Sequence, residues 1–383
     1  MANTMLLTRR ARFLKSLFTL DHRVRLGDVP VEIHPCPFVR EMGNRERDDP
    51  RDRVLPGDFY PVPDNRVVEN ERFSYPVFLP RGASRASQAI ILLHGLNERD
   101  WDKYLPWAER LLLDTGKAVI LFPIAFHVNR VPTPWRDSRV LHALAGERRR
   151  GMSDAANATF VNVAISTRLS ACPSRFHLSG KETLFNLWQL VAAIRDGRHP
   201  LFHEGTTVDL FAYSIGALLA QVLLLADPCQ LTTASRLFIF CGGALFSYMD
   251  GSARDIIDRE AYSRVRSFYL NEFLSTPGAL DDPFDEAFRA LILPGLSRER
   301  REAFFERARA RVRVVTLDND TVMPTAGARA ALGEGLAREM LDEMSFPFPC
   351  THQQPFPLHE RVSPSLVHRS FEALFSRAAA LLA

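Results

Sequence analysis

Residues 206–227 read TTVDLFAYSIGALLAQVLLLAD, and this stretch carries the strongest structural signal in the chain. The pattern predicts an apolar strand up to Tyr213 and a helix directly after Ser214. The small residues Ala212 and Gly216 let the strand and the helix pass close together, and Gly216 also tolerates backbone angles that a larger residue resists. The turn therefore holds the Ser214 hydroxyl beside the free N–H groups and the positive dipole end of a helix.

A strand–helix–strand unit is predicted upstream of this turn. The apolar run at residues 89–93 is followed by His94-Gly95-Leu96-Asn97, and a helix with a plausible N-cap at Asp100 then extends to Gly116. A second apolar run follows at residues 118–123. Such a unit is the building block of a parallel sheet.

In this order of elements the chain resembles the α/β-hydrolase superfamily from about Ser87 to the C-terminus, as a branch with an Ala-x-Ser-x-Gly turn. The resemblance implies an α/β-hydrolase fold, with a mostly parallel central sheet, helices on both faces and a helical cap insertion. It makes Ser214 the nucleophile on the strand-to-helix turn, and the backbone N–H groups of Leu96 and Ile215 the oxyanion hole. One departure is Ala212, where the family most often has glycine. The other interpretation of His94-Gly95 is a plain turn that ends a buried strand.

The family also implies an acid and a histidine downstream of the serine. The strand predicted at residues 312–317 is followed by DNDTVMP, in which Asp320 and Pro324 match the family's Asp-x-x-x-Pro pattern. Asp318 is the second candidate, and either aspartate also has an ordinary role as a turn former or helix cap.

His352 occupies the place of the family's histidine, between the last short apolar run and the C-terminal helix. His359 lies one loop further on and is the second candidate. His368 falls within the amphipathic segment 365–382, where a position on a helix face is expected. The expected catalytic set is Ser214, Asp320 and His352.

We expect the chain to divide into four parts. Residues 1–86 are an N-terminal extension that includes the first strands, at 29–33 and 73–79. Residues 87–243 are the first part of the hydrolase core, residues 244–310 are the helical cap insertion, and residues 311–383 are the second part of the core. Within the first part of the core, residues 124–180 form a long excursion before a helix at 181–195. Long connections of this kind are often functional.

Substrate-binding residues are expected where this excursion leaves the carboxyl end of a strand, because ligands bind there in open α/β sheets. The candidates are His127, Trp135, Asn97 and Tyr213. The other interpretation is that these side chains only brace their loops.

Composition excludes several classes of function. The net charge of +3 over 383 residues gives no field strong enough to indicate nucleic-acid binding. The five cysteines show neither a C-x-x-C pair nor metal-ligand spacing, so we expect reduced thiols and a cytoplasmic location. No transmembrane segment is expected. The basic N-terminal segment 1–28 could lie on a membrane surface, but a tail that is either frayed or docked on the protein is the preferred interpretation.

The sequence thus predicts a serine hydrolase that cleaves a carboxylic ester or related acyl bond of a small-molecule substrate through an acyl-enzyme, with no metal and no organic cofactor. Two alternatives stay open: a non-catalytic binding protein on the same fold, and an acyltransferase or amidase with the same residues. The sequence does not distinguish ester from amide or thioester substrates, and it does not give the oligomeric state.

Overall fold

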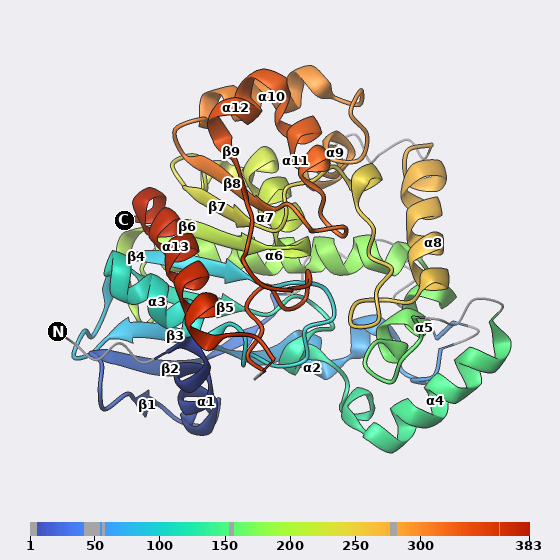
Figure 1. Ribbon diagram of the computed structural model, residues 1–383, viewed down its shortest axis with the longest axis horizontal. Coiled ribbons are helices and arrows are strands. Elements are labelled where there is room, and N and C mark those ends of the chain that lie inside the picture. The colour runs from blue at the N-terminus through green and yellow to red at the C-terminus, as the bar shows by residue number, and fades with distance from the viewer. Residues whose placement is uncertain (1–5, 42–53, 56–57, 153–156, 276–281, 360) are drawn as a thin grey trace.

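The computed structural model describes residues 6–41, 54–55, 58–152, 157–275, 282–359 and 361–383. In these residues nine strands form one sheet, in the order β1-β2-β3-β5-β4-β6-β7-β8-β9 (Figure 1). The strands are β1 (Val24–Arg25), β2 (Val31–Val39), β3 (Arg72–Pro80), β4 (Ala86–Leu93), β5 (Ala118–Phe122), β6 (Phe202–Tyr213), β7 (Leu237–Phe240), β8 (Val312–Leu317) and β9 (Leu341–Met344).

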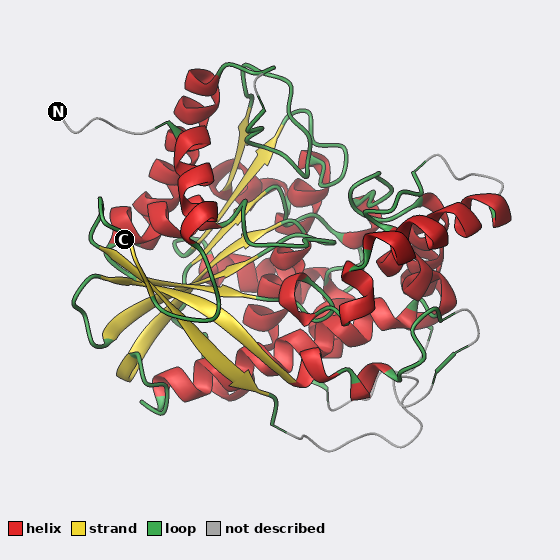
Figure 2. Cartoon of the chain, turned by 90° about the horizontal axis from the view of Figure 1, so that it is seen from below, coloured by secondary structure: helices red, strands yellow, loops and turns green. Residues whose placement is uncertain are grey.

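The neighbouring strands β5, β4, β6, β7, β8 and β9 are parallel to one another. Strands β1, β2 and β3 add an antiparallel edge next to β5. Strands β5 (AVILF) and β7 (LFIF) are buried over their whole length, as expected for parallel strands covered on both faces. Figure 2 shows helices on both sides of the sheet. The fold class predicted from the sequence, an α/β-hydrolase fold with a mostly parallel sheet between two layers of helices, is confirmed.

Two apolar cores lie on the two faces of the sheet. Helices α1 (Leu7–Leu17), α3 (Leu105–Thr115) and α13 (Pro364–Leu382) cover one face. The other face carries the larger core and the helices that contribute buried residues to it. They include α5 (Val163–Ala171), α6 (Ser174–Arg195), α7 (Ile215–Ala226), α8 (Arg259–Ser267), α9 (Pro283–Ala290), α10 (Arg298–Ala308), α11 (Thr325–Leu332) and α12 (Glu334–Met340).

The N-terminal segment forms helix α1, which packs against α3 and α13. Leu7, Ala11 and Leu14 are buried in this contact, and the Arg10 guanidinium pairs with Glu109 of α3. The described part of the segment is therefore docked on the protein, which is one of the two arrangements preferred from the sequence. In the described part of the chain, no helix is both long enough and apolar enough to span a bilayer.

The excursion at residues 124–180 contains more regular structure than the sequence indicated. It includes α4 (Ser138–Gly151), α5 and the first turns of α6, which begins at Ser174 and not at residue 181. Gly180 looks like a boundary in the sequence but lies inside α6. There its missing side chain makes room, because a Cβ at this position would lie 3.2 Å from Phe288 and 3.3 Å from Leu219.

The close approach of α7 to the end of β4 depends on Gly216. A Cβ built at this position would lie 2.7 Å from the carbonyl oxygens of both Leu93 and His94. These are backbone atoms, so the clash cannot be relieved by rotating a side chain. Any residue larger than glycine forces the helix that begins after Ser214 away from the sheet.

We expect Gly216→Ala to lower the free energy of unfolding by about 1–3 kcal/mol, because it overpacks a backbone contact. Urea unfolding of the wild type and the variant measures the change. Gly146→Ala is the matched control in helix α4, because its nearest contact would be the end of the Arg150 side chain at 3.8 Å. The control should be neutral or stabilising by up to about 1 kcal/mol. Equal stability of Gly216→Ala and Gly146→Ala would contradict the role assigned to Gly216 in the approach of α7 to β4.

Candidate active site

Ser214 lies at the junction of β6 and α7 with φ 57° and ψ −126°. A positive φ is unusual for a residue with a side chain, and such backbone angles are maintained only where the surrounding structure fixes them. The Gly216 contact and the pairing of β6 with β4 and β7 supply that constraint here.

Three predicted residues meet at this turn. Ser214 Oγ lies 2.6 Å from His352 Nε2, and His352 Nδ1 lies 2.7 Å from Asp320 Oδ2. Asp320 follows β8, and His352 lies in the connection between β9 and α13. All three side chains are buried. The fold therefore brings Asp320 and His352 to Ser214 from segments more than a hundred residues further along the chain.

Asp320 is held as a carboxylate. One of its oxygens accepts hydrogen bonds from the backbone N–H groups of Val322 and Met323, at 2.9 and 3.0 Å. Burial alone would raise the pKa of Asp320, but the hydrogen bond and charge of His352, together with these N–H groups, lower it below its ordinary value. An ionised Asp320 fixes the proton of His352 on Nδ1 and leaves Nε2 as an acceptor for the Ser214 hydroxyl proton.

The alternative candidates lie elsewhere. Asp318 and His359 are exposed, and His368 is part of α13. In the described residues, none of the three makes a hydrogen bond to Ser214, Asp320 or His352.

Tyr213, predicted as a substrate-binding residue, is not among the residues that line the two cavities described below. It is fully buried, and its ring stacks on the His352 ring with centroids 5.5 Å apart. Its hydroxyl donates a hydrogen bond to the carbonyl oxygen of His352. Side chains alternate between the two faces of a strand, and the Tyr213 side chain lies on the face opposite to the pocket. Tyr213 therefore contacts His352 from that face.

The turn at residues 94–97 passes directly beside the serine. A Cβ at Gly95 would lie 3.3 Å from the Ser214 Cβ. His94 fixes the turn, because its Nε2 accepts from the Ile124 N–H at 2.9 Å and its Nδ1 donates to the Gly95 carbonyl at 2.8 Å. Burial lowers the pKa of His94 far below its ordinary value and keeps the ring neutral. In the part of the chain that the structure covers, the backbone N–H groups of Leu96 and Ile215 donate no hydrogen bond.

The loop at 94–97, the loop that follows His352 and the segment at 244–310 are joined by hydrogen bonds at one point. Gln353 Nε2 donates to the carbonyl oxygens of Leu96 and Asp255, at 3.0 and 3.2 Å. Asn97 Nδ2 donates to the same Asp255 carbonyl at 2.9 Å and to the Val161 carbonyl at 3.2 Å. Asn97, predicted as a substrate-binding residue, therefore braces its loop.

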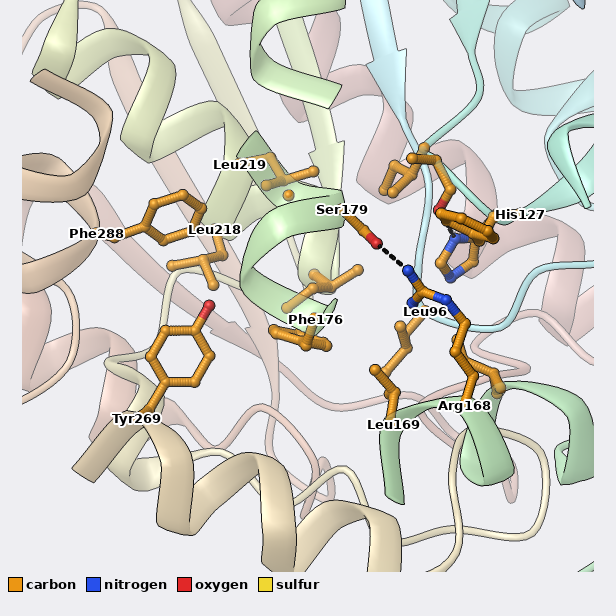
Figure 3. Close-up of a pocket in the computed structure, with 16 residues that line it drawn as sticks. Leu96, His127, Arg168, Leu169, Phe176, Ser179, Leu218, Leu219, Tyr269 and Phe288 are labelled. Carbon is orange, nitrogen blue, oxygen red and sulfur yellow. Dashed lines mark hydrogen bonds between the residues drawn. The ribbon is translucent and has the colours of Figure 1, made fainter. Parts of the chain in front are cut away.

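Leu96 and Ile215 both line one cavity. Most of its lining is apolar, and the polar exceptions include His127 and Arg168 (Figure 3). Tyr269 and Phe288 reach it from the segment between β7 and β8. The lining residues are Leu96, Ile124, Ala125, Phe126, His127, Ile165, Arg168, Leu169, Phe176, Ser179, Gly180, Ile215, Leu218, Leu219, Tyr269 and Phe288.

Trp135, the remaining predicted substrate-binding residue, lines a neighbouring pocket together with Asn97. Its ring packs between Phe59 and Phe126, at centroid distances of 5.7 and 5.9 Å. Phe126 and Ile165 line both pockets and form the wall between them. Of the four predicted side chains, only His127 lines the cavity next to Ser214.

No pattern in the sequence indicated a role for Arg168 or Gln353. An arginine in a helix is usually solvated, and its burial here depends on the distant residue Asp64, which accepts from Arg168 Nη2 at 2.7 Å. Within the described ranges, no group of three or more His, Cys, Asp or Glu side chains is arranged to hold a metal ion.

A family model described as "Family of unknown function (DUF6051)" matches residues 50–383. The chain belongs to this family. No curated protein matches the sequence. A family of unknown function names no reaction, so the chemistry of this DUF6051 chain has to be argued from its own site.

Several solved structures are similar to this DUF6051 chain at low identity. They include a bacterial heroin esterase (12% identity, 98% of this chain and 90% of that chain, TM-score 0.45) and an S-formylglutathione hydrolase from Agrobacterium tumefaciens (11%, 93% and 97%, TM-score 0.44). A hyperthermophilic esterase from the archaeon Pyrobaculum calidifontis is similar at 11% identity, with 97% and 89% covered and a TM-score of 0.44. Likenesses this distant carry no conclusion about activity.

Asp320→Asn should make the stability difference from wild type depend on pH. Because the pKa of Asp320 is lower in the folded protein than in the unfolded chain, its ionisation stabilises the fold above about pH 4. This stabilisation is lost as the pH falls through the lowered folded pKa. Urea unfolding from pH 7 downward should therefore show a gap between the two proteins that narrows below about pH 4. A gap that stays constant, or that also appears for the exposed Asp318→Asn, would contradict this assignment.

Proposed function

We propose that this chain is a serine hydrolase that cleaves a carboxylic ester or a related acyl bond through an acyl-enzyme. The observation that carries the proposal is the continuous chain of contacts from Ser214 Oγ through His352 to Asp320, at 2.6 and 2.7 Å. These distances lie within the hydrogen-bond reach that a general base needs to activate a serine hydroxyl.

In the first half of the reaction, Ser214 Oγ attacks the acyl carbon and His352 Nε2 takes the hydroxyl proton. Asp320 stabilises the imidazolium that forms. The carbonyl oxygen gains the negative charge, and the unpaired N–H groups of Leu96 and Ile215 are the donors proposed to bind it. His352 then returns the proton to the leaving oxygen, the bond to the alcohol breaks, and the acyl group remains on Ser214.

In the second half, water attacks the acyl-enzyme. His352 takes a proton from this water, the same N–H pair binds the oxyanion, and the proton returns to Ser214 Oγ as the ester bond breaks. The products are a carboxylic acid and the free serine, so the cycle needs no group beyond these residues and water.

The cavity at Leu96 and Ile215 is the proposed acyl pocket, because both residues that supply the oxyanion donors line it. Its walls come from the excursion at 124–180 and from the segment at 244–310, which we propose acts as the cap. Tyr269 and Phe288 of this segment are fully buried against the pocket. Substrate size and polarity would then be set by these two insertions and not by the sheet.

The alternative of a non-catalytic binding protein is less well supported. A chain that kept only the fold would have no reason to hold a histidine between a buried carboxylate and a serine, because each buried polar group has a desolvation cost. Transfer of the acyl group to an acceptor other than water uses the same first half-reaction and is distinguished by the product.

Labelling by a fluorophosphonate probe, with the adduct located by mass spectrometry, tests the proposal. We expect the wild type to be labelled at Ser214 and Ser214→Ala to be unlabelled. His352→Ala should react at least about a thousand-fold more slowly, because the serine loses its base. His359→Ala is the matched control and should react like the wild type. A folded wild-type protein that stays unlabelled at Ser214 would count against an activated serine.

A further inference from the structure

His127 presents an unpaired acceptor in the proposed acyl pocket. Its Nδ1 donates to the Ala125 carbonyl oxygen at 2.9 Å, which leaves Nε2 without a proton. Burial lowers the pKa of His127 to about 4, so the ring is neutral at pH 7. The side chain is only 4% exposed, and in the described part of the protein Nε2 has no hydrogen-bond partner.

Arg168 presents an unpaired donor in the same cavity. Its Nη2 donates to Asp64 Oδ2 at 2.7 Å and to Ser179 Oγ at 2.9 Å, and its guanidinium lies 3.8 Å from the centre of the Phe126 ring. The Nε–H is buried and unpaired among the residues that the structure describes. Figure 3 shows Arg168 and His127 at the same end of the pocket, opposite Tyr269 and Phe288.

This pair of groups is poorly matched to a plain hydrocarbon chain. When a ligand displaces water from a buried donor and a buried acceptor without hydrogen bonding to them, these hydrogen bonds are lost and the ligand binds more weakly. The rest of the lining consists mainly of leucine, isoleucine and phenylalanine, for which an alkyl chain is well suited. The occupant that satisfies both parts of the cavity is an apolar chain that carries one polar group.

The charges around Arg168 exclude an anion as this polar group. Arg168 and Arg175 are balanced by Asp64 and Asp58, since Asp64 pairs with both arginines and Asp58 with Arg175. Neutral His127 has only the lone pair of Nε2 free, and a carboxylate has no proton to donate to it. The polar group therefore has to be neutral and has to donate and accept at once, as a hydroxyl does.

We propose that the acyl pocket selects acyl groups that carry a hydroxyl. The hydroxyl proton is donated to His127 Nε2, and the hydroxyl oxygen accepts from Arg168 Nε–H. This inference rests on the proposed hydrolase function and specifies its substrate class: esters of hydroxy acids in preference to esters of plain or anionic acids of the same length.

The test compares kcat/KM, measured by pH-stat, for two matched sets of methyl esters. One set is methyl hexanoate, methyl 6-hydroxyhexanoate and monomethyl adipate, and the other is methyl butanoate, methyl 3-hydroxybutanoate and monomethyl succinate. We expect at least one hydroxy ester to exceed both of its partners by about tenfold or more, because only it pairs both buried groups. The two acyl chain lengths place the hydroxyl at two different depths in the pocket, at which it can reach His127 and Arg168.

Variants connect this preference to the two side chains. In His127→Leu the ratio of hydroxy ester to plain ester should fall to about one, since the acceptor is replaced by an apolar group. Arg168→Lys keeps the charge opposite Asp64 but removes Nε–H, and should also reduce the ratio. His142→Leu is the matched control, because His142 is exposed and stacks on Phe160 outside the cavity. Its ratio should equal that of the wild type.

The outcomes separate this inference from the proposed function. If Ser214 is labelled by the fluorophosphonate and the plain esters are cleaved as fast as the hydroxy esters, the hydroxyl subsite is overturned and the hydrolase stands. Preference for a carboxylate-terminated ester also overturns it. If a variant does not fold, calorimetry on Ser214→Ala decides, since this protein should bind 6-hydroxyhexanoate about tenfold more tightly than hexanoate. Equal binding would overturn the subsite.

Discussion

The contact between Gly216 and the carbonyl oxygens of Leu93 and His94 is the constraint on which the site depends. It brings the start of α7 against the end of β4, and so places the serine, its helix and the turn at 94–97 within a few ångströms of one another. The backbone angles of Ser214 follow from this contact, because a strand and a helix that pass so closely leave no room for a wider turn. Beside this contact lie the N–H groups of Leu96 and Ile215, which donate no hydrogen bond within the described residues.

The histidine is positioned from the opposite side of the sheet. Tyr213, the residue before the serine, stacks on the His352 ring and bonds its carbonyl oxygen, and Tyr213 is itself packed edge-on against Trp107 of α3. Two consecutive residues thus hold the pair together, since Ser214 contacts the His352 ring at Nε2 and Tyr213 stacks on the same ring. Tyr213 belongs to the aromatic core under α3 and α13, so this core contributes directly to the geometry of the site.

The sequence predicted those parts of the molecule that follow from local pattern. Apolar strands, glycine positions and the order of serine, aspartate and histidine are all readable along the chain, and the parallel sheet that they implied is confirmed. The same reasoning pointed to Ser214, Asp320 and His352, which the fold brings together, while their catalytic role remains a proposal. The burial of Arg168 and the close packing at Gly180 inside α6 depend on partners such as Asp64 and Phe288. These partners lie far away in sequence, so no local pattern reports them.

The carbonyl oxygen of Asp255 accepts hydrogen bonds from both Asn97 and Gln353, and Gln353 also holds Leu96. Asp255 belongs to the segment proposed as the cap, Leu96 to the turn beside the serine, and Gln353 follows His352 directly in the chain. The segment at 244–310 and the two loops that flank Ser214 are thus tied together by hydrogen bonds at one carbonyl oxygen, so none of the three can shift without straining or breaking these bonds.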